Sequence, residues 1–253
     1  MFPIRDENPT YHTSVMTFAI IGLNVLSWIF LQGFGRSPVL AKSVCQFGLI
    51  PAELLGLLPA GTRISVGRGV LCVIENDSPW ITVITSMFMH GSWFHLIGNL
   101  WFLAVFGDNV EDVMGPVKFF MFYLLCGIVA GAVQVAMNPS SPIPMVGASG
   151  AISGVMGAYA ILFPKAPVHL LIFIGFFITT IVVPAFIVLG YWFLLQLLGG
   201  FMSTGTGGVA FGAHIGGFLA GIFLLKLFCQ SDRIEECRLK RGTTDKIIKR
   251  RRR

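Results

Sequence analysis

Phe119 to Met137 reads FFMFYLLCGIVAGAVQVAM and contains no charged residue. A helix that crosses the hydrocarbon core of a bilayer needs about 20 mostly apolar residues, so this stretch is long enough to span a membrane. The rest of the chain suits the same environment, because 55% of its residues are hydrophobic and only 12% are charged, against roughly 25% charged in a soluble domain. Its mean hydropathy is +0.78. The sequence therefore predicts an integral membrane protein.

Further apolar stretches accompany this one and predict an all-α fold, a polytopic bundle of six transmembrane helices. They are Val15 to Leu31, Trp93 to Phe106, Ala148 to Phe163, the later part of Leu170 to Leu198, and Ala213 to Phe228. Pro184 divides the longest stretch, so we expect its first part to be a bent or amphipathic segment that does not span. The second and fourth spans are too short and too polar to face lipid, so we expect them at the centre of the bundle.

The chain reads as one domain between two polar ends. Residues 1–14 form a short N-terminal segment, 15–229 hold the six spans, and 230–253 form a basic tail that ends in the run Lys249 to Arg253. Prolines interrupt the segment 32–85, so we expect it to be a loop that lies partly on the membrane surface.

The distribution of charge predicts how the bundle is oriented. The formal net charge is +6, and most Lys and Arg residues lie near the C-terminus, which is typical of a cytoplasmic tail. Because an even number of spans puts both termini on one side, we expect both in the cytoplasm and the 32–85 loop outside. Lys165 and an acidic turn from Asp108 to Asp112 then lie inside. Ser149 and His214 fall near the outer ends of their helices.

Polar side chains inside spans are costly and usually functional. The second span and the residues before it read HGSWFHLIGN, with His90, His95 and Asn99. His95 and Asn99 are four apart and therefore share one face of a helix. Ser149 opens the fourth span, and His214 lies at the start of the sixth. These residues are the candidates for a functional site.

Small residues recur every four positions in the fourth and sixth spans. The two strips are Ser149, Ser153 and Gly157 in one span, and Ala213, Gly217 and Gly221 in the other. Such strips let two helices approach closely, so packing them together would bring Ser149 within hydrogen-bond reach of His214. The alternative is that the strips serve packing alone and the serines bond backbone carbonyls. Histidines on two partner helices, with an asparagine, favour a site.

Buried histidines also occur in zinc sites and proton relays. His90 and His95 are five apart and diverge on a regular helix, and no carboxylate at the same depth is available as a general base. Proton carriers usually place Asp or Glu inside their spans, whereas these spans contain neither. We therefore expect no metal and no cofactor.

Taken together, the motifs resemble those of the rhomboid family of intramembrane serine proteases. The matching elements are Gly-x-Ser-Gly at Gly147 to Gly150, Ala-His-x-Gly-Gly at Ala213 to Gly217, and His-x-x-x-Asn at His95 and Asn99. They occur in the family's order, and the resemblance covers the six spans without the basic tail.

The resemblance implies that Ser149 is the nucleophile and that His214 takes its proton, as a dyad without an acidic third member. It also implies that His95, Asn99 and the backbone N–H of Ser149 stabilise the oxyanion. Supporting positions around the same cavity would be His90, Gly147 and Gly150. Burial disfavours the charged imidazolium, so we expect His214 to rest in its neutral form.

By the same resemblance, the substrate is a spanning helix of another membrane protein, cut near its outer end. The expected surroundings are the lipid bilayer, with no nucleic acid, in the inner membrane of a prokaryotic cell and with both termini cytoplasmic. The main alternative is a catalytically inactive relative that binds membrane helices, and a transporter comes third.

The chain departs from some family members at two positions. Ser153 stands where they carry a tyrosine that stacks on the base, so another residue has to orient His214. Ile81 follows Trp80 where they carry an arginine. The Gly-rich segment from Ser203 to Gly212 is either a lid or a simple turn. Cys45 and Cys72 share the outer loop and could form a disulfide.

Overall fold

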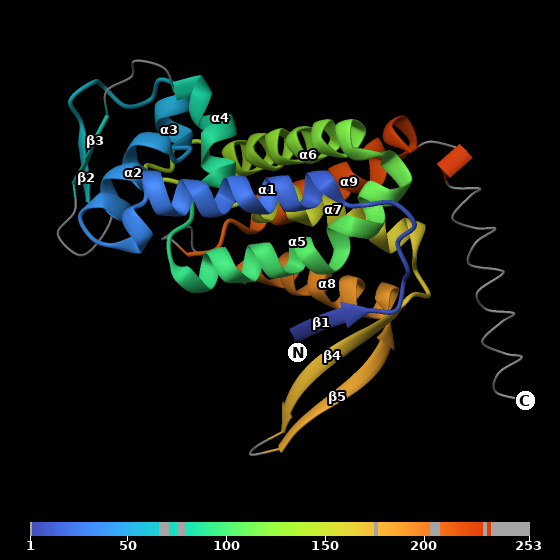
Figure 1. The fold of residues 1–253 in the computed structure, drawn as a ribbon. Coiled ribbons are helices and arrows are strands. Elements are labelled where there is room, and N and C mark those ends of the chain that lie inside the picture. The colour runs from blue at the N-terminus through green and yellow to red at the C-terminus, as the bar shows by residue number, and fades with distance from the viewer. Residues whose placement is uncertain are drawn as a thin grey trace, which may run out of the picture.

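The computed structural model describes residues 2–65, 71–74, 79–174, 177–202, 208–229 and 232–233. Within them, long helices lie side by side along a common direction, and smaller elements lie at the two ends of the bundle (Figure 1). The long helices are α1 (Val15–Leu26) with its π-helical continuation η1 (Ser27–Leu31), α5 (Trp93–Met114), α6 (Pro116–Met137), α7 (Ser149–Leu162), α8 (Ala185–Met202) and α9 (Phe211–Phe228).

These helices follow the predicted stretches, with one difference in α5. The expected acidic turn from Asp108 to Asp112 is wrong, because the helix continues through it to Met114. Three of the described helices, α6, α8 and α9, are long and apolar enough to cross a membrane. The chain is therefore an integral membrane protein, whereas the count of six spans stays a prediction.

Helix α7 lies at the centre of the bundle, as predicted for the fourth span. Every residue from Gly150 to Tyr159 is buried. The second span, in contrast, has side chains on the outside of the bundle, because Phe94 and Ile97 of α5 are 91% and 50% exposed. The prediction that this span is central is therefore wrong. It relied on the shortness of the apolar stretch, and α5 is eight residues longer than that stretch.

The fold is not all-α, which corrects the predicted fold class. β1 (Phe2–Asp6), β4 (Pro167–Ile174) and β5 (Phe177–Pro184) form an antiparallel sheet in the order β1-β4-β5. The first part of the long apolar stretch is thus a β-hairpin that projects from one end of the bundle (Figure 1), and its later part is α8, as expected. Hydropathy alone did not separate helix from strand in this β-branched and aromatic sequence.

The segment 32–85 contains several short elements at one end of the bundle (Figure 1). They are η2 (Gly33–Gly35), α2 (Val39–Phe47), α3 (Pro51–Leu54), β2 (Arg63–Ser65), β3 (Leu71–Val73), η3 (Pro79–Ile81) and α4 (Thr82–Thr85), and η4 (Ser86–Phe88) follows them. Leu49 pairs with Met145 in an isolated β-bridge, which ties this loop to the segment before α7. The loop and Ser149 therefore lie at the same end of the bundle.

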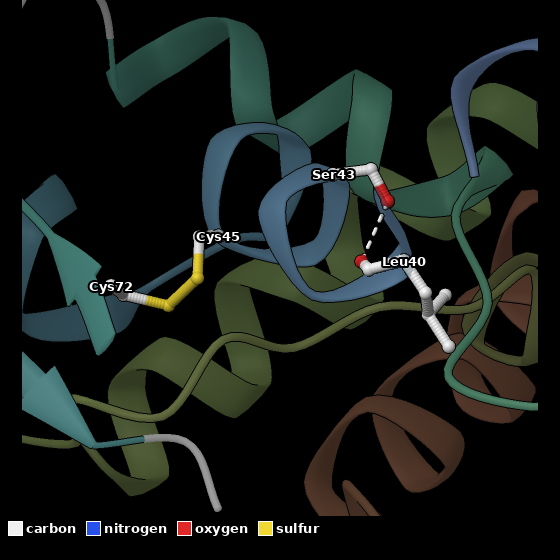
Figure 2. Close-up of a disulfide and its surroundings, with 4 residues drawn as sticks. All are labelled: Leu40, Ser43, Cys45 and Cys72. Carbon is white, nitrogen blue, oxygen red and sulfur yellow. Dashed lines mark hydrogen bonds between the residues drawn. A yellow bond between two sulfur atoms is a disulfide. The ribbon is translucent and has the colours of Figure 1, made fainter. Parts of the chain in front are cut away.

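A disulfide joins Cys45 of α2 to Cys72 of β3, with the two Cα atoms 5.3 Å apart (Figure 2). The pairing that the sequence left open is therefore present. Next to it, the Ser43 hydroxyl donates to the carbonyl oxygen of Leu40 at 2.8 Å, which completes a turn of α2. Because disulfides persist in oxidising compartments, this bond supports an external position for the loop.

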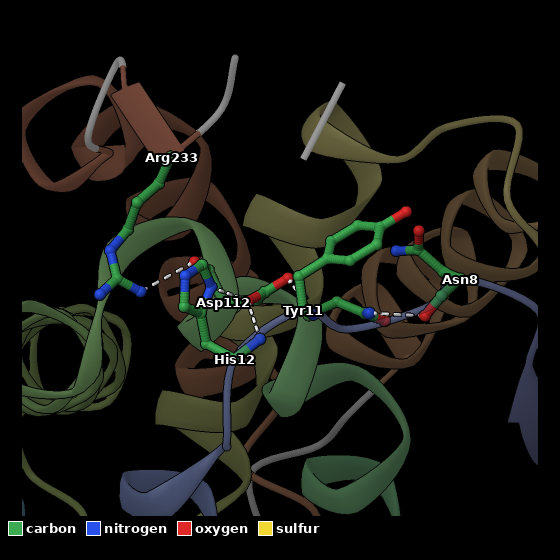
Figure 3. A network of polar contacts seen from close by, with 6 residues as sticks. Asn8, Tyr11, His12, Asp112 and Arg233 are labelled. Atoms are coloured by element: carbon green, nitrogen blue, oxygen red, sulfur yellow. Dashed lines mark hydrogen bonds and ion pairs between the residues drawn. The ribbon is translucent and has the colours of Figure 1, made fainter. Parts of the chain in front are cut away.

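At the opposite end, the last turns of α5 hold the N-terminal segment by its backbone. The Asp112 carboxylate accepts hydrogen bonds from the backbone N–H groups of Tyr11 and His12 at 3.0 and 2.9 Å, and it contacts the His12 ring at 2.6 Å (Figure 3). Arg233 donates to the Asp112 carbonyl oxygen at 3.3 Å. The acidic residues that were expected in a turn thus anchor the segment before α1.

Candidate active site

Glycines bring α7 and α9 into backbone contact. A Cβ atom added at Gly217 would overlap the carbonyl oxygen of Gly150, and one added at Gly221 would overlap that of Gly154. The predicted strip on α9 is confirmed at these two positions. On α7, Gly157 of the predicted strip is also in contact, because a Cβ atom there would overlap the carbonyl oxygen of Phe218. At the other two positions the contacts are made by Gly150 and Gly154, the residues after Ser149 and Ser153.

This packing brings the predicted nucleophile and base together. The Oγ of Ser149, the first residue of α7, lies 2.8 Å from Nε2 of His214. The two residues are 65 positions apart in the sequence. A hydroxyl at hydrogen-bond distance from an imidazole nitrogen can pass its proton to that nitrogen while its oxygen attacks an electrophile.

Gln196 of α8 contacts the other side of the His214 ring, and the sequence did not reveal it. Its Oε1 lies 2.8 Å from Nδ1 of His214. Trp192, one turn earlier in α8, packs against the same ring with the ring centroids 5.7 Å apart and an interplanar angle of 39°. Both residues contact a ring for which the sequence suggested no partner besides Ser149. A signal was present, since Gln196 is the amide side chain in the apolar stretch 185–202.

His95 and Asn99 lie one helical turn apart on α5, and both line the cavity that contains Ser149. The backbone N–H of Gly91 donates to Nδ1 of His95 at 3.4 Å, which leaves Nε2 as the protonated nitrogen of a neutral ring. Asn99 is only 8% exposed, and its Nδ2 has no hydrogen-bond partner among the described residues. The cavity thus contains two side-chain N–H donors.

His90 is fully buried and lies behind His95, with the ring centroids 5.1 Å apart. It precedes α5, so the argument that His90 and His95 diverge on one helix was wrong. His90 is not among the residues that line the cavity, which corrects the role implied by the resemblance. Gln32 holds it in place through two hydrogen bonds to its backbone. Burial and, to a smaller extent, the neighbouring His95 lower the pKa of His90 to about 3.

Gly147 and Gly150 lie at positions on either side of Ser149 where a larger residue would not fit. Gly147 has a φ of +133°, and a Cβ atom there would lie 2.7 Å from Nε2 of His95. A side chain at Gly150 would press on Ala130. Ser153 bonds within α7, because its hydroxyl donates to the carbonyl oxygen of Ser149 at 2.6 Å. Ser153 therefore satisfies a backbone carbonyl, as the alternative expected, and it also lines the cavity.

The cavity has a volume of about 690 Å³ and is lined by residues of α5, α6, α7, α8 and α9. Its polar side chains include those of Ser149, His214, His95 and Asn99, and its apolar walls include Trp192 and the exposed Phe94. A cavity of this size accommodates several residues of a peptide. In the described part of the chain, no three His, Cys, Asp or Glu side chains gather in a group that could hold a metal ion.

The segment after α8 contributes to the rim of this cavity at 208–212. Residues 203–207, half of the Gly-rich segment for which a lid was suggested, lie outside the described part of the chain. The same holds for most of the basic tail, 230–253, of which the structure describes Asp232 and Arg233.

Comparison with known proteins finds the same family that the motifs suggested. The model of the rhomboid domain matches residues 77–231. The chain is 28% identical to the mitochondrial rhomboid protein 1 of Saccharomyces cerevisiae, over 81% of this chain and 62% of that protein. It is 31% identical to the rhomboid protease GluP of Bacillus subtilis, over 87% of this chain and 35% of that protein.

A third relative, the chloroplastic rhomboid-like protein 11 of Arabidopsis thaliana, is 37% identical over 35% of this chain and 32% of that protein. The chain thus spans between about a third and somewhat under two thirds of the length of these relatives. They come from a bacterium, a mitochondrion and a chloroplast, so the prediction of a prokaryotic inner membrane is not supported.

Proposed function

This chain belongs to the rhomboid family, and from that premise we propose that it is a serine endopeptidase that cleaves spanning segments of other membrane proteins. The observation that carries the proposal is the distance of 2.8 Å between Oγ of Ser149 and Nε2 of His214. Two relatives, GluP and YdcA of Bacillus subtilis, are named as rhomboid proteases, YdcA as a putative one.

In the first step, the Ser149 oxygen attacks the carbonyl carbon of a peptide bond and its proton passes to Nε2 of His214. A tetrahedral intermediate forms with negative charge on the former carbonyl oxygen. His214, now an imidazolium, donates the proton to the amide nitrogen as the C–N bond breaks. The amine product leaves, and the acyl group stays on Ser149.

The negative oxygen needs donors that are already in place. The Nδ2 of Asn99 and the Nε2 of His95 are such donors on the wall of the cavity next to Ser149. The backbone N–H of Ser149 is a third, because the first N–H groups of a helix have no carbonyl partner within it. We assign these three groups to the stabilisation of the oxyanion.

In the second half of the reaction, water attacks the acyl carbon and His214 takes a proton from that water. The bond between the acyl carbon and Oγ of Ser149 then breaks, His214 returns the proton to Oγ, and the carboxylic acid product leaves. Water has to reach a serine that lies at the membrane. The cavity supplies a route, since the polar side chains of Gln134, Asn138 and Ser141 line it as well.

We further propose that the bundle crosses the membrane six times, with the disulfide-bonded loop outside and both termini in the cytoplasm. The shorter apolar helices α1 and α7 would then span together with α5, α6, α8 and α9. Ser149 lies at the same end as the Cys45–Cys72 disulfide, so the cut would fall near the outer end of the substrate helix. A helix has to unwind there to expose its carbonyl groups.

A relative that binds membrane helices without cutting them is the alternative, and an activity probe separates the two. The purified protein in detergent is treated with a fluorophosphonate, which reacts with activated serines, and the labelled peptide is identified by mass spectrometry. We expect the label on Ser149, and its absence from Ser149→Ala and His214→Ala.

Cleavage is tested in liposomes with a single-span substrate. Ser149→Ala should abolish it while the protein stays folded, because alanine is smaller than serine and leaves the glycine contacts between α7 and α9 unchanged. A metal chelator should have no effect. Turnover that persists in Ser149→Ala, with the wild-type rate, would exclude the serine mechanism.

A further inference from the structure

Gln196 is a polar residue on the inward face of a helix that is otherwise apolar. The buried residues of α8 are Ala185, Leu189 and Gln196. Only 9% of Gln196 is exposed. A buried amide in a spanning helix is costly unless its hydrogen-bonding groups are satisfied, so its partners indicate what it is used for.

The two ends of the Gln196 amide have different partners. The Nε2 group donates to the carbonyl oxygen of Trp192 in the preceding turn, at 3.3 Å. This bond turns Oε1 toward His214, where it lies 2.8 Å from Nδ1. An amide oxygen can only accept a hydrogen bond, so the proton of the neutral imidazole is on Nδ1.

The position of that proton decides whether His214 can act as a base. With the proton on Nδ1, the lone pair is on Nε2, and Nε2 is the nitrogen 2.8 Å from Oγ of Ser149. The other neutral tautomer would present an N–H to the serine and could not accept its proton. Trp192 packs on the ring from the same helix, which limits its rotation.

At position 196, an amide is more suitable than the carboxylate that completes the catalytic triad of soluble serine proteases. The described residues that line the cavity include no Asp, Glu, Lys or Arg. A carboxylate at Gln196 would be a buried charge, which is expensive in a membrane. An amide accepts the same hydrogen bond from Nδ1 without a net charge.

We propose that Gln196 is a positioning residue that holds His214 in the Nδ1-protonated tautomer. Gln196 does not line the cavity and acts only through the histidine. The inference rests on the proposed function, and it adds a third member from α8 to the Ser149–His214 pair.

Three variants test the role of the acceptor oxygen. Gln196→Met keeps a similar length and removes the amide oxygen, whereas Gln196→Glu keeps an oxygen at the same place. Leu195→Ala is the control, because Leu195 is the neighbouring residue of α8 and is 43% exposed. The kcat and KM for a single-span substrate are measured in liposomes for each variant.

We expect Gln196→Met to lower kcat by about 10- to 100-fold with little change in KM, the loss that is typical when the partner orienting a metal-ligating histidine is removed. Gln196→Glu should retain more of the turnover than Gln196→Met, and Leu195→Ala should match the wild type. A wild-type kcat in Gln196→Met would overturn the proposal. Equal losses of kcat in the methionine and glutamate variants, with equal thermal unfolding midpoints in detergent, would also overturn it, because the oxygen would then not matter.

A measurement on the unmutated residue keeps the proposal testable if the methionine variant does not fold. Nitrogen-15 NMR of histidine-labelled protein, with the His214 signals assigned by comparison with His214→Gln, reports which ring nitrogen carries the proton. We expect Nδ1, and a proton on Nε2 would refute the role of Gln196. Fluorophosphonate labelling of Ser149 in the wild type tests the proposed function separately, so the failure of one proposal is distinguished from the failure of the other.

Discussion

Gly217 of α9 lies against Gly150 of α7 so closely that a Cβ atom on Gly217 would overlap the Gly150 carbonyl oxygen. Ser149 and His214 are sequence neighbours of residues in the same helix contact, Gly150 and Ala213. The distance between the serine oxygen and the imidazole therefore depends on how closely the two backbones approach. Close packing through small residues is a general means of association between helices in membranes.

Gly217→Ala should destabilise the protein and reduce its activity. The added methyl group has no space, and overpacking of this kind costs about 1 to 3 kcal/mol. Gly190→Ala is the matched control, because a Cβ atom at Gly190 of α8 meets nothing within 4 Å, and it carries the same gain in helix propensity. Thermal unfolding in detergent should show a lower midpoint for Gly217→Ala alone. Equal midpoints for both variants would mean that α7 and α9 can move apart without cost.

The sequence predicted those residues of the site that occur in short motifs with a characteristic spacing. Ser149, His214, His95 and Asn99 occur in short motifs, and the structure brings all four to one cavity. Gln196 could not be assigned in this way, because its meeting with His214 depends on how α8 packs on α9. A single amide in an apolar stretch gives no indication of its partner.

The β4–β5 hairpin was missed for a different reason. A hydropathy window responds to the apolar residues of Pro167–Ile174 and Phe177–Pro184 in the same way whether they form a helix or a strand pair. A strand pair is distinguished from a helix here by its pairing: β4 pairs with β1, which is distant in the sequence, and with β5, which is its neighbour. Long-range pairing of this kind is not encoded in local periodicity.

Glu111→Ala should lower stability through the start of α1. The Glu111 carboxylate accepts hydrogen bonds from the backbone N–H groups of Met16 and Thr17, at 2.8 and 2.7 Å, and from the Thr17 hydroxyl at 2.7 Å. Its removal leaves these donors without that acceptor, which costs about 1 to 3 kcal/mol. Glu111→Gln keeps one acceptor oxygen and should lose less. Both are compared by thermal unfolding in detergent.

The same variants should keep the turnover of the folded protein. Glu111 is twelve residues from Asn99 on α5, or about 18 Å at the rise of an α-helix. If Glu111→Ala lowers kcat at a temperature where the protein is fully folded, the N-terminal end of the bundle is coupled to the site, contrary to this expectation.

Asn99→Ala should reduce kcat by roughly 10²- to 10³-fold with a smaller effect on KM, because the amide would donate to charge that develops only in the transition state. Ile97→Ala serves as the control, because Ile97 lies on the same helix and is 50% exposed. Steady-state cleavage of a single-span substrate in liposomes supplies both constants. An effect confined to KM would exclude Asn99 from the stabilisation of the oxyanion. His95→Ala should behave in the same direction, although His95 also packs on His90.

The Cys45–Cys72 disulfide gives a direct test of orientation. In a variant with Cys126, Cys229 and Cys237 changed to alanine, a membrane-impermeant maleimide added to intact cells should not react. After treatment with an impermeant reductant, both remaining cysteines should be labelled, because the loop that carries them is expected outside. Labelling only after the cells are broken open would place the loop and Ser149 at the cytoplasmic face and overturn the substrate geometry.

Activity should fall as the pH is lowered, because a protonated His214 has no lone pair with which to accept the serine proton. Among the described residues that line the cavity, His95 and His214 are the titratable side chains. A plot of kcat/KM against pH should therefore rise with the slope of a single proton and reach a plateau where His214 is neutral.

His95→Gln separates the two histidines in this profile. Its side chain keeps an N–H donor for the oxyanion but does not titrate, so the variant should be slower and still lose activity at low pH. The acidic limb belongs to His214 if it survives in His95→Gln. If the limb disappears in that variant, the titration seen in the wild type is that of His95, and Ser149 is activated by a base other than the one proposed.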